Sequence, residues 1–201
     1  MIIGILAGGK GTRLGHITSD IPKPLVEVNS VPFIAILLNY WVIKGATEFV
    51  ISIGYLGHKI SDHLGYSYGG IPISYVDEGE PKGTAFAFRS LCNFIGSPFV
   101  LVNGDTFVDV DVEKLMEAES ELTVGCCYRI PNSRFGLIEC DEKFQVLSIR
   151  SKTKRISTNP QLTSTGVLAV NSLKWTPEFD EPSDGKIDEK IILSAAKKGR
   201  K

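Results

Sequence analysis

The amino-acid sequence predicts an α/β fold with a Rossmann-like, mixed and mainly parallel central sheet flanked by helices. Three observations predict it. Short apolar runs alternate along the chain with segments of helical period. The first apolar run opens into a glycine-rich loop. The 201 residues, 43% of them hydrophobic and 22% charged, suffice for one domain with a sizeable core, so we expect a single domain over residues 1–201.

The first hundred residues hold the regular part of the pattern. Apolar runs predict buried strands at Ile2–Ala7, Glu48–Ile53, Ile71–Val76 and Phe99–Val102. The segments between them predict helices at Pro32–Lys44, Gly57–Leu64 and Thr84–Leu91. Right-handed crossovers would bring the ends of the first and fourth strands to one central crevice, which is where open α/β sheets bind ligands.

The second half is less regular, and its strands are expected to extend the same sheet. A helix is expected at Asp111–Ser120. Strands are expected at Leu122–Tyr128, Gly136–Cys140, Phe144–Arg150 and Leu162–Val170. A last amphipathic helix is expected at Lys186–Lys198, with Ile187, Ile191 and Ile192 facing inward.

Composition excludes several classes of function. A net charge of −1 argues against broad binding to nucleic acid or to a membrane surface. The first apolar run is too short for a signal peptide or a membrane span. The three histidines do not pair with cysteines at metal-ligand spacing, which argues against a zinc site. The four cysteines form no CxxC pair, so we interpret them as reduced, mostly buried thiols of a cytoplasmic protein.

The loop after the first strand has the composition of a phosphate-binding site. It runs Leu6-Ala7-Gly8-Gly9-Lys10-Gly11-Thr12-Arg13-Leu14-Gly15, and Pro22-Lys23-Pro24 follows. Glycines let backbone N–H groups approach a phosphate, while Thr12, Arg13 and Lys23 add a hydroxyl and two cations. The sequence contains no GxxxxGK[ST], and Leu14 occupies the place of the third glycine of GxGxxG. The alternative interpretation is a glycine-rich turn with surface cations.

These two segments resemble the sugar-1-phosphate nucleotidyltransferase family, whose members open with a strand, a G-x-G-T-R-type loop and a downstream PKP segment. Within it, Asp20-Ile21-Pro22-Lys23-Pro24 and Val102-Asn103-Gly104-Asp105-Thr106-Phe107 are most similar to hexose- and heptose-1-phosphate guanylyltransferases. The resemblance extends from Met1 to about Val170. It implies the nucleotide-diphospho-sugar transferase type of fold, with a nucleotide-binding half at 1–110 and a sugar-phosphate-binding half at 111–201.

The resemblance implies nucleotidyl transfer: a sugar 1-phosphate attacks the α-phosphorus of a nucleoside triphosphate, GTP being favoured, and pyrophosphate leaves. Arg13 would face the β- and γ-phosphates, Lys23 would stabilise the α-phosphate, and Asp105 would hold Mg²⁺. The residues expected to bind the nucleotide are Leu6, Ala7, Gly8, Gly9, Gly11, Thr12, Gly83, Thr84 and Asn103. From the residues alone, Asp105 is equally a turn aspartate and Gly83-Thr84 an ordinary helix start.

The resemblance also implies an acceptor site, with Gly136, Lys152 and Thr165 expected to contact the sugar phosphate. Two departures from the family pattern bear on it. Ser151 stands where the family usually has glutamate before the lysine, which leaves the sugar open. The family's second metal-binding aspartate has no counterpart in a matching context, and the chain ends sooner than the family does.

Three other functions follow from the same residues. The first is the same chemistry with CTP, UTP or dTTP and another phosphorylated acceptor. The second is a nucleotide-binding module without catalysis, which the short C-terminal part favours. The third, a dinucleotide-binding oxidoreductase, is disfavoured because no acidic residue ends a strand about 20 positions past the loop. A homo-oligomer is left open.

Overall fold

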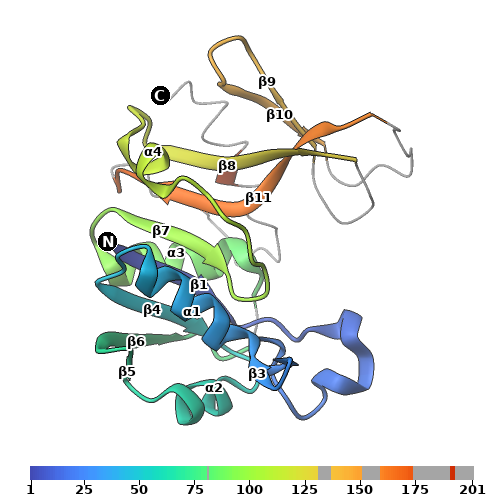
Figure 1. The fold of residues 1–201 in the computed structure, drawn as a ribbon, viewed down its shortest axis with the longest axis vertical. Helices are drawn as coiled ribbons and strands as arrows, with labels where there is room; N and C mark the ends of the chain where they lie inside the picture. The colour runs from blue at the N-terminus through green and yellow to red at the C-terminus, as the bar shows by residue number, and fades with distance from the viewer. Residues whose placement is uncertain (81, 131–136, 151–158, 174–190, 193–201) are drawn as a thin grey trace.

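The computed structural model of this protein describes residues 1–80, 82–130, 137–150, 159–173 and 191–192 (Figure 1). It confirms the predicted α/β fold. Its main strands are β1 Ile2–Leu6, β4 Glu48–Ile53, β5 Ser67–Tyr68, β6 Ile71–Asp77, β7 Phe99–Asn103, β8 Leu122–Arg129, β9 Leu137–Cys140, β10 Val146–Arg150 and β11 Gln161–Val170. Within the described residues these strands form one mixed sheet in the order β10-β9-β11-β7-β1-β4-β6-β5, and β8 pairs with β11.

The helices of the described residues are α1 Phe33–Ile43, α2 Gly57–Leu64, α3 Thr84–Ile95 and α4 Val112–Glu117. Every helix and strand expected in the first hundred residues is present. The largest difference is at α3, which continues to Ile95 rather than ending at Leu91. The sequence did not predict the short elements β5, the 3₁₀ helices η1 Thr12–Thr18 and η2 Lys23–Leu25, or the hairpin of β2 Glu27–Val28 with β3 Val31–Pro32.

The centre of the sheet is parallel and positions the site. β1 lies between β4 and β7 and runs parallel to both. Leu6 at the end of β1 is in register with Ser52 on one side and with Asn103 on the other. The carboxyl ends of these three strands therefore meet at one edge of the sheet, as the crossover rule predicts.

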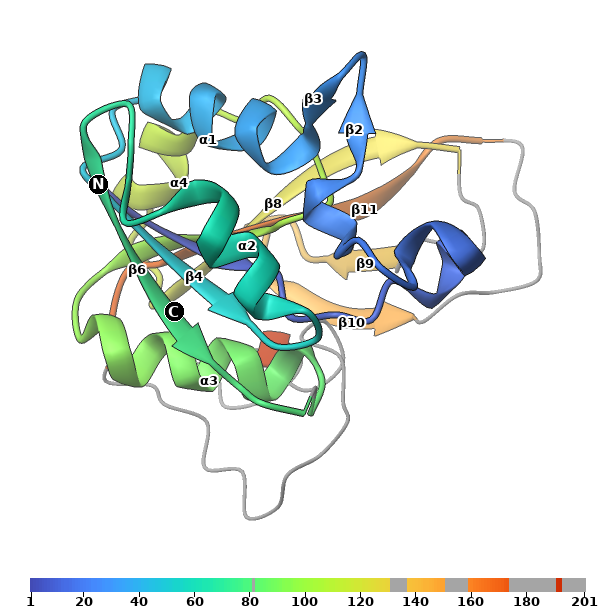
Figure 2. The same ribbon diagram turned by 90° about the horizontal axis from the view of Figure 1, so that it is seen from below.

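Both faces of the central strands β1, β4 and β7 are buried, which explains why these strands are mostly apolar. Alternate residues point to opposite faces: Ile3 and Ile5 belong to the cluster under α1 and α2, whereas Leu101 and Val50 belong to the cluster under α3. Figure 2 shows α1 and α3 on opposite sides of the sheet. The largest side chains that these two clusters bury are Trp41, Phe49, Phe88 and Phe99.

Gly4, an unusual residue for the middle of a buried strand, makes room for an aromatic ring. A Cβ at this position would lie 2.9 Å from the Phe99 ring and 3.5 Å from Leu91. Phe99 is in turn fully buried, 6.3 Å from the ring of Phe88 on α3. The glycine therefore lets α3 and β7 pack closely over β1.

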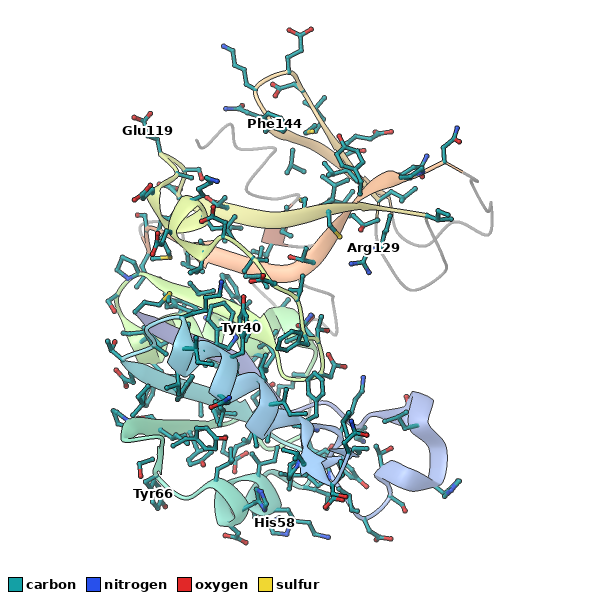
Figure 3. All side chains as sticks on the ribbon, in the orientation of Figure 1. Tyr40, His58, Tyr66, Glu119, Arg129 and Phe144 are labelled. Carbon is teal, nitrogen blue, oxygen red and sulfur yellow. The ribbon has the colours of Figure 1, made fainter. Side chains whose placement is uncertain are left out.

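The later strands extend the sheet in the antiparallel sense. β11 pairs with β7 through Val167–Val170 and with β8 along its length, with a register shift between Ser164 and Leu168. The β9–β10 hairpin continues the sheet beyond β11, and Phe144 lies near its far end (Figure 3).

Two expected elements have different bounds. β10 begins at Val146, not at Phe144, because Asp141 closes a turn: its carboxylate accepts from the N–H of Lys143 and of Gln145, and Phe144 has a φ of +59°. α4 begins after Asp111, whose side chain caps the helix by accepting from the N–H of Lys114, and it ends at Glu117 rather than Ser120.

All four cysteines are free, but the expectation that most are buried is wrong. Only Cys92 is buried, and burial raises the pKa of its thiol to about 12. Cys126 is exposed on β8, and Cys127 and Cys140 are half-buried. Of the expected helix at 186–198 only Ile191 and Ile192 lie within the described residues, and both are buried. None of the described helices is both long and apolar enough to cross a membrane.

Candidate functional site

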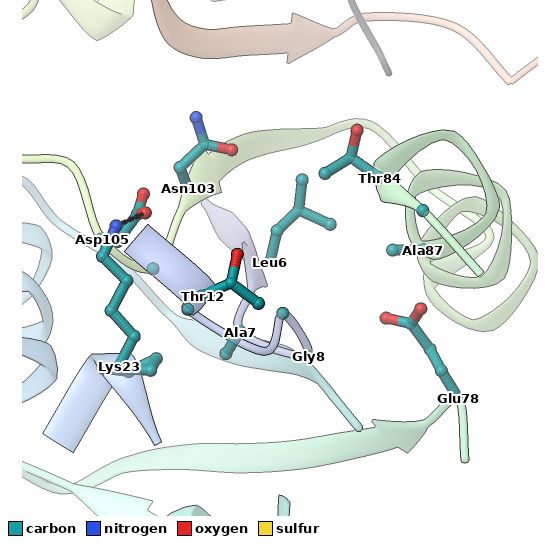
Figure 4. A pocket seen from close by; sticks show the side chains of 15 residues that line it. Leu6, Ala7, Gly8, Thr12, Lys23, Glu78, Thr84, Ala87, Asn103 and Asp105 are labelled. Carbon is teal, nitrogen blue, oxygen red and sulfur yellow. Dashed lines mark hydrogen bonds and ion pairs between the residues drawn. The ribbon is translucent and has the colours of Figure 1, made fainter. Parts of the chain in front are cut away.

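A cavity of about 340 Å³ opens at the carboxyl ends of β1 and β7. Figure 4 shows its side chains. All nine residues expected to bind a nucleotide line it, and so do Lys23 and Asp105. The described residues that line it are Leu6, Ala7, Gly8, Gly9, Gly11, Thr12, Lys23, Pro24, Glu78, Gly83, Thr84, Ala87, Asn103, Gly104 and Asp105.

The glycine loop lies against the end of β4 because neither Gly8 in the loop nor Gly54 after β4 has a side chain. A Cβ on Gly8 would lie 3.2 Å from the N of Gly54, and one on Gly54 would lie 3.1 Å from the carbonyl oxygen of Gly8. The N–H of Tyr55 donates to that carbonyl at 3.2 Å. The loop is therefore fixed to the sheet edge through its backbone.

Gly11 turns the loop into η1. It has a φ of +63°, and its carbonyl accepts from the N–H of Leu14 at 2.9 Å and from the hydroxyl of Thr18 at 3.1 Å. An added Cβ would lie 3.0 Å from Thr18 and 3.2 Å from Cβ of Lys23. The glycine thus brings the lysine segment η2 close to the loop, which sequence spacing alone does not predict.

Gly104 brings Asp105 to the same cavity from the other side. Its N–H donates to the carbonyl of Leu6 at 2.9 Å, and an added Cβ would lie 2.8 Å from that oxygen. The chain leaving β7 therefore passes directly over the end of β1. Asp105 follows and forms an ion pair with Lys23 (Figure 4). The side chains of Lys23 and Asp105 are 28% and 35% exposed, so both remain open to a ligand.

Gly83 and Thr84 lie at the amino end of α3, as expected. Gly83 caps the helix with a φ of 96°, a conformation that favours glycine. The first turn of a helix has N–H groups without intrahelical partners and carries partial positive charge. Gly83, Thr84 and Ala87 all line the cavity, so this helix end faces the ligand space.

Four other predicted residues cannot be placed as directly. Arg13 lies in η1, but its side chain is outside the described residues, as are Gly136 and Lys152. Thr165 is described and does not line the cavity. It is 6% exposed, and its hydroxyl donates to the carbonyl of Gly125 at 2.7 Å, where it joins β11 to β8. Its predicted contact with the sugar phosphate stays a prediction.

Of the four lining residues that the sequence did not predict (Pro24, Glu78, Ala87 and Gly104), Glu78 is the one with an ionisable side chain. It follows β6, and its carboxylate accepts a hydrogen bond from the hydroxyl of Ser52. Burial raises the pKa of Glu78, and the charge of Asp77 acts in the same direction, whereas Ser52 and Lys82 lower it. An acidic residue directly after an apolar strand was the signal used for Asp105, and it would have found Glu78 as well.

The cavity is electrostatically divided. Figure 4 shows Lys23 and Asp105 at one end, Glu78 with Ala87 and Thr84 at the other, and Gly8 and Thr12 between them. The Lys23 side chain at one end, with the glycine loop beside it, suits phosphates, and the Glu78 carboxylate at the other end suits a group with hydrogen-bond donors. Among the described residues, no group of three or more His, Cys, Asp or Glu could hold a metal ion.

The parallel centre of the sheet, the glycine loop after β1 and the Lys23–Asp105 pair at the carboxyl edge are typical of α/β proteins that bind nucleotides. Comparison with known sequences identifies the family within this class of protein. The chain belongs to the nucleotidyl transferase family, whose model matches residues 3–172.

The curated and solved relatives agree with this family. D-glycero-alpha-D-manno-heptose 1-phosphate guanylyltransferase from Campylobacter jejuni is 34% identical over 148 residues, which cover 74% of this chain and 67% of the relative. UTP–glucose-1-phosphate uridylyltransferase AglF from Haloferax volcanii is 28% identical over 165 residues, covering 79% and 68%. The crystal structure of HddC from Yersinia pseudotuberculosis complexed with GMP-PN superposes with a TM-score of 0.82 at 28% identity, covering 96% of this chain and 85% of HddC.

Proposed function

We propose that this protein is a sugar-1-phosphate nucleotidyltransferase that uses GTP and a manno-heptose or mannose 1-phosphate, and releases pyrophosphate. The observation that supports the reaction is the cavity itself, in which the glycine loop, Lys23 and Asp105 meet at the carboxyl edge of the sheet. Relatives that are named guanylyltransferases support the choice of substrates.

The reaction needs positioning and charge neutralisation more than acid–base catalysis. The phosphate of a sugar 1-phosphate is already an anion, so it can attack the α-phosphorus in line without a strong general base. Lys23 neutralises charge that develops at the α-phosphate, and Thr12 and the loop amides orient the triphosphate. Arg13 is proposed to face the β- and γ-phosphates, which leave as pyrophosphate.

Asp105 fits a role as a Mg²⁺ ligand. Mg²⁺ is bound by one or two carboxylates together with substrate phosphates and water, and Asp105 offers a partly exposed carboxylate beside the phosphate loop. When bound there, Mg²⁺ would neutralise phosphate charge. Lys23 holds the Asp105 carboxylate in place from the protein side.

Glu78 supports guanine as the base. A guanine ring presents N1–H and the 2-amino group as adjacent donors, and an ionised carboxylate accepts both. Cytosine, by contrast, has no ring N–H on that edge, and uracil offers one donor flanked by acceptors. We therefore assign the Glu78 end of the cavity to the base and the Lys23 end to the phosphates.

A pyrophosphate-release assay tests the proposal. The assay contains Mg²⁺, each of GTP, CTP, UTP and dTTP, and a panel of sugar 1-phosphates led by mannose and manno-heptose types. Release should occur with GTP and disappear in Asp105→Asn, while Asp111→Asn, which alters an exposed helix cap, should retain it. Nucleotide binding without release from any pair would favour a binding module instead.

A second donor is supported by one observation. Relatives named uridylyltransferases also match over most of this chain, among them AglF and N-acetylmuramate alpha-1-phosphate uridylyltransferase from Neisseria meningitidis, which covers 59% of it. Release with UTP rather than GTP in the same assay would establish this alternative.

A further inference from the structure

Ser52 is a fully buried polar residue that belongs to the wall behind the cavity. It lies on β4 in register with Leu6, and its exposed fraction is 0%. Its carbonyl accepts from the N–H of Ala7 at 2.9 Å, which fixes the start of the glycine loop. Its hydroxyl donates to Oε1 of Glu78. A single buried residue is thus bonded to the phosphate loop by its backbone and to Glu78 by its side chain.

Two hydrogen bonds fix Glu78, and the lack of a side chain at Gly8 leaves room for its carboxylate. Its N–H donates to the carbonyl of Ile53 at 2.9 Å, which fixes the backbone beside β4. The hydroxyl of Ser52 fixes the carboxylate. Gly8 leaves the space that Oε1 occupies, since a Cβ on Gly8 would lie 3.2 Å from that atom. The carboxylate therefore has one defined orientation toward the cavity, in which Ser52 supplies the side-chain bond.

We propose that Ser52 is the positioning residue that orients Glu78 for reading the Watson–Crick edge of the nucleotide base. This inference rests on the proposed function, in which Glu78 binds guanine. Each carboxylate oxygen accepts up to two hydrogen bonds. Ser52 uses one site on Oε1, so Oε1 and Oε2 can still accept from N1–H and from the 2-amino group.

Ser52 also favours the ionised form of Glu78, which is the form that accepts two donors. Burial and the charge of Asp77 raise the pKa of Glu78, and the Ser52 hydroxyl and the charge of Lys82 lower it. Removing the hydroxyl should therefore raise that pKa further. As the pH is lowered, Glu78 would then become protonated at a higher pH than in wild type, and the affinity for guanine would fall with it.

The test compares GTP with ITP, whose base lacks only the 2-amino group. Calorimetric titrations are made with Mg²⁺ but without a sugar 1-phosphate, so that no transfer occurs, between pH 5 and pH 8. Wild type should bind GTP about ten- to a hundredfold more tightly than ITP. Ser52→Ala should reduce this ratio of GTP to ITP affinity by about five- to tenfold. In this variant the ratio should also begin to fall at a higher pH when the solution is acidified. Ser52→Thr, which keeps the hydroxyl, should restore both.

Two controls separate positioning from a general loss of structure. Ser74→Ala removes a hydroxyl from β6, in register with Val50, and should leave the ratio unchanged. In the Glu78→Gln background, Ser52→Ala should cause little further change in the ratio, because the charged acceptor is already gone. Ser52→Cys, with a weaker donor of similar size, replaces Ser52→Ala if that variant does not fold.

The outcomes distinguish this inference from the proposed function. Equal weakening of GTP and ITP in Ser52→Ala would show a purely structural role and overturn the inference. If wild type instead favours another nucleoside triphosphate, the assignment of GTP is wrong. In that case a changed preference in Ser52→Ala would support the role of Ser52, and an unchanged preference would overturn it. Equal wild-type affinity for all bases would overturn both.

Discussion

Lys23 and Asp105 form an ion pair at the phosphate end of the cavity, although they lie 82 positions apart in the chain. Each of the two residues reaches the cavity because a glycine lets its segment pack closely against β1 or the loop that follows it. Gly11 brings the segment of Lys23 against the loop, and Gly104 brings Asp105 over the end of β1. At the residue scale, the arrangement of Lys23 and Asp105 therefore depends on two glycines that carry no reactive side chain.

Lys23→Met should lower kcat by about a hundredfold, because a preorganised charge at a developing oxyanion typically contributes that much. The measurement is steady-state pyrophosphate release. Lys10→Met is the matched control, because Lys10 is a cation of the glycine loop whose side chain is 55% exposed, with Nζ 3.9 Å from Oε2 of Glu80. Equal effects of the two changes would show that only the net charge of the loop matters.

Glu78→Gln should change which base is preferred. An amide offers one acceptor and one donor, which match N3–H and O4 of uracil or thymine better than the two donors of guanine. We expect kcat/KM for GTP to fall by about tenfold to a hundredfold, with a smaller loss or a gain for UTP. An unaltered GTP-to-UTP ratio would place the base elsewhere in the cavity.

At the scale of the elements, the packing of β1 against β7 and α3 depends on Gly4. Gly4→Ala would bring a Cβ to 2.9 Å from the Phe99 ring, so the ring or the strand must shift. We expect a loss of about 1–3 kcal/mol in the free energy of unfolding. Denaturant titration measures it. Phe99→Leu in the same chain should relieve the clash, so that the double variant loses less than the two single changes together.

The elements of the first half could be predicted from sequence because β1, β4 and β7 are mostly apolar on both faces and each helix is followed closely by a glycine. β4 and α2 have the expected bounds. The bounds of β10 and α4 could not be predicted, because Asp141 and Asp111 form side-chain bonds to nearby backbone N–H groups that compete with regular structure.

Part of the candidate site could be predicted from sequence and part could not. The loop, Lys23, Asp105 and the start of α3 were recognisable as motifs. Glu78 has the same strand-end position as Asp105 and could have been predicted with it, but its bond to Ser52 could not, because that contact depends on the pairing of β4 with β6, a tertiary property. The predicted roles of Gly136 and Lys152 lie outside the described residues.

For the whole molecule, Glu78 should link ligand binding to stability. Burial raises its pKa in the folded protein, so the folded state binds a proton more tightly than the unfolded chain does. This contribution to stability is present at acidic pH and is lost as pH rises from the unfolded pKa through the raised folded pKa. At neutral pH the ionised carboxylate is therefore destabilising.

Glu78→Gln should raise the Tm at neutral pH by a few degrees at most while weakening GTP binding, which is the usual exchange between stability and function at a binding site. The difference in Tm should vanish at a pH below both pKa values, where Glu78 is protonated. Thermal melts across pH measure this. A lower Tm at neutral pH would show that the Ser52 bond outweighs the cost of burying the charge.

The central place of β1 also has a consequence for biosynthesis. β1 is synthesised well before one of its two partners, β7, which begins at Phe99, and before β11, which pairs with β7 and begins at Gln161. At ordinary translation speeds the wait for β7 is on the order of ten seconds. Throughout that time one side of this apolar strand has no partner, so the parallel centre of the sheet can close only after β7 has been synthesised.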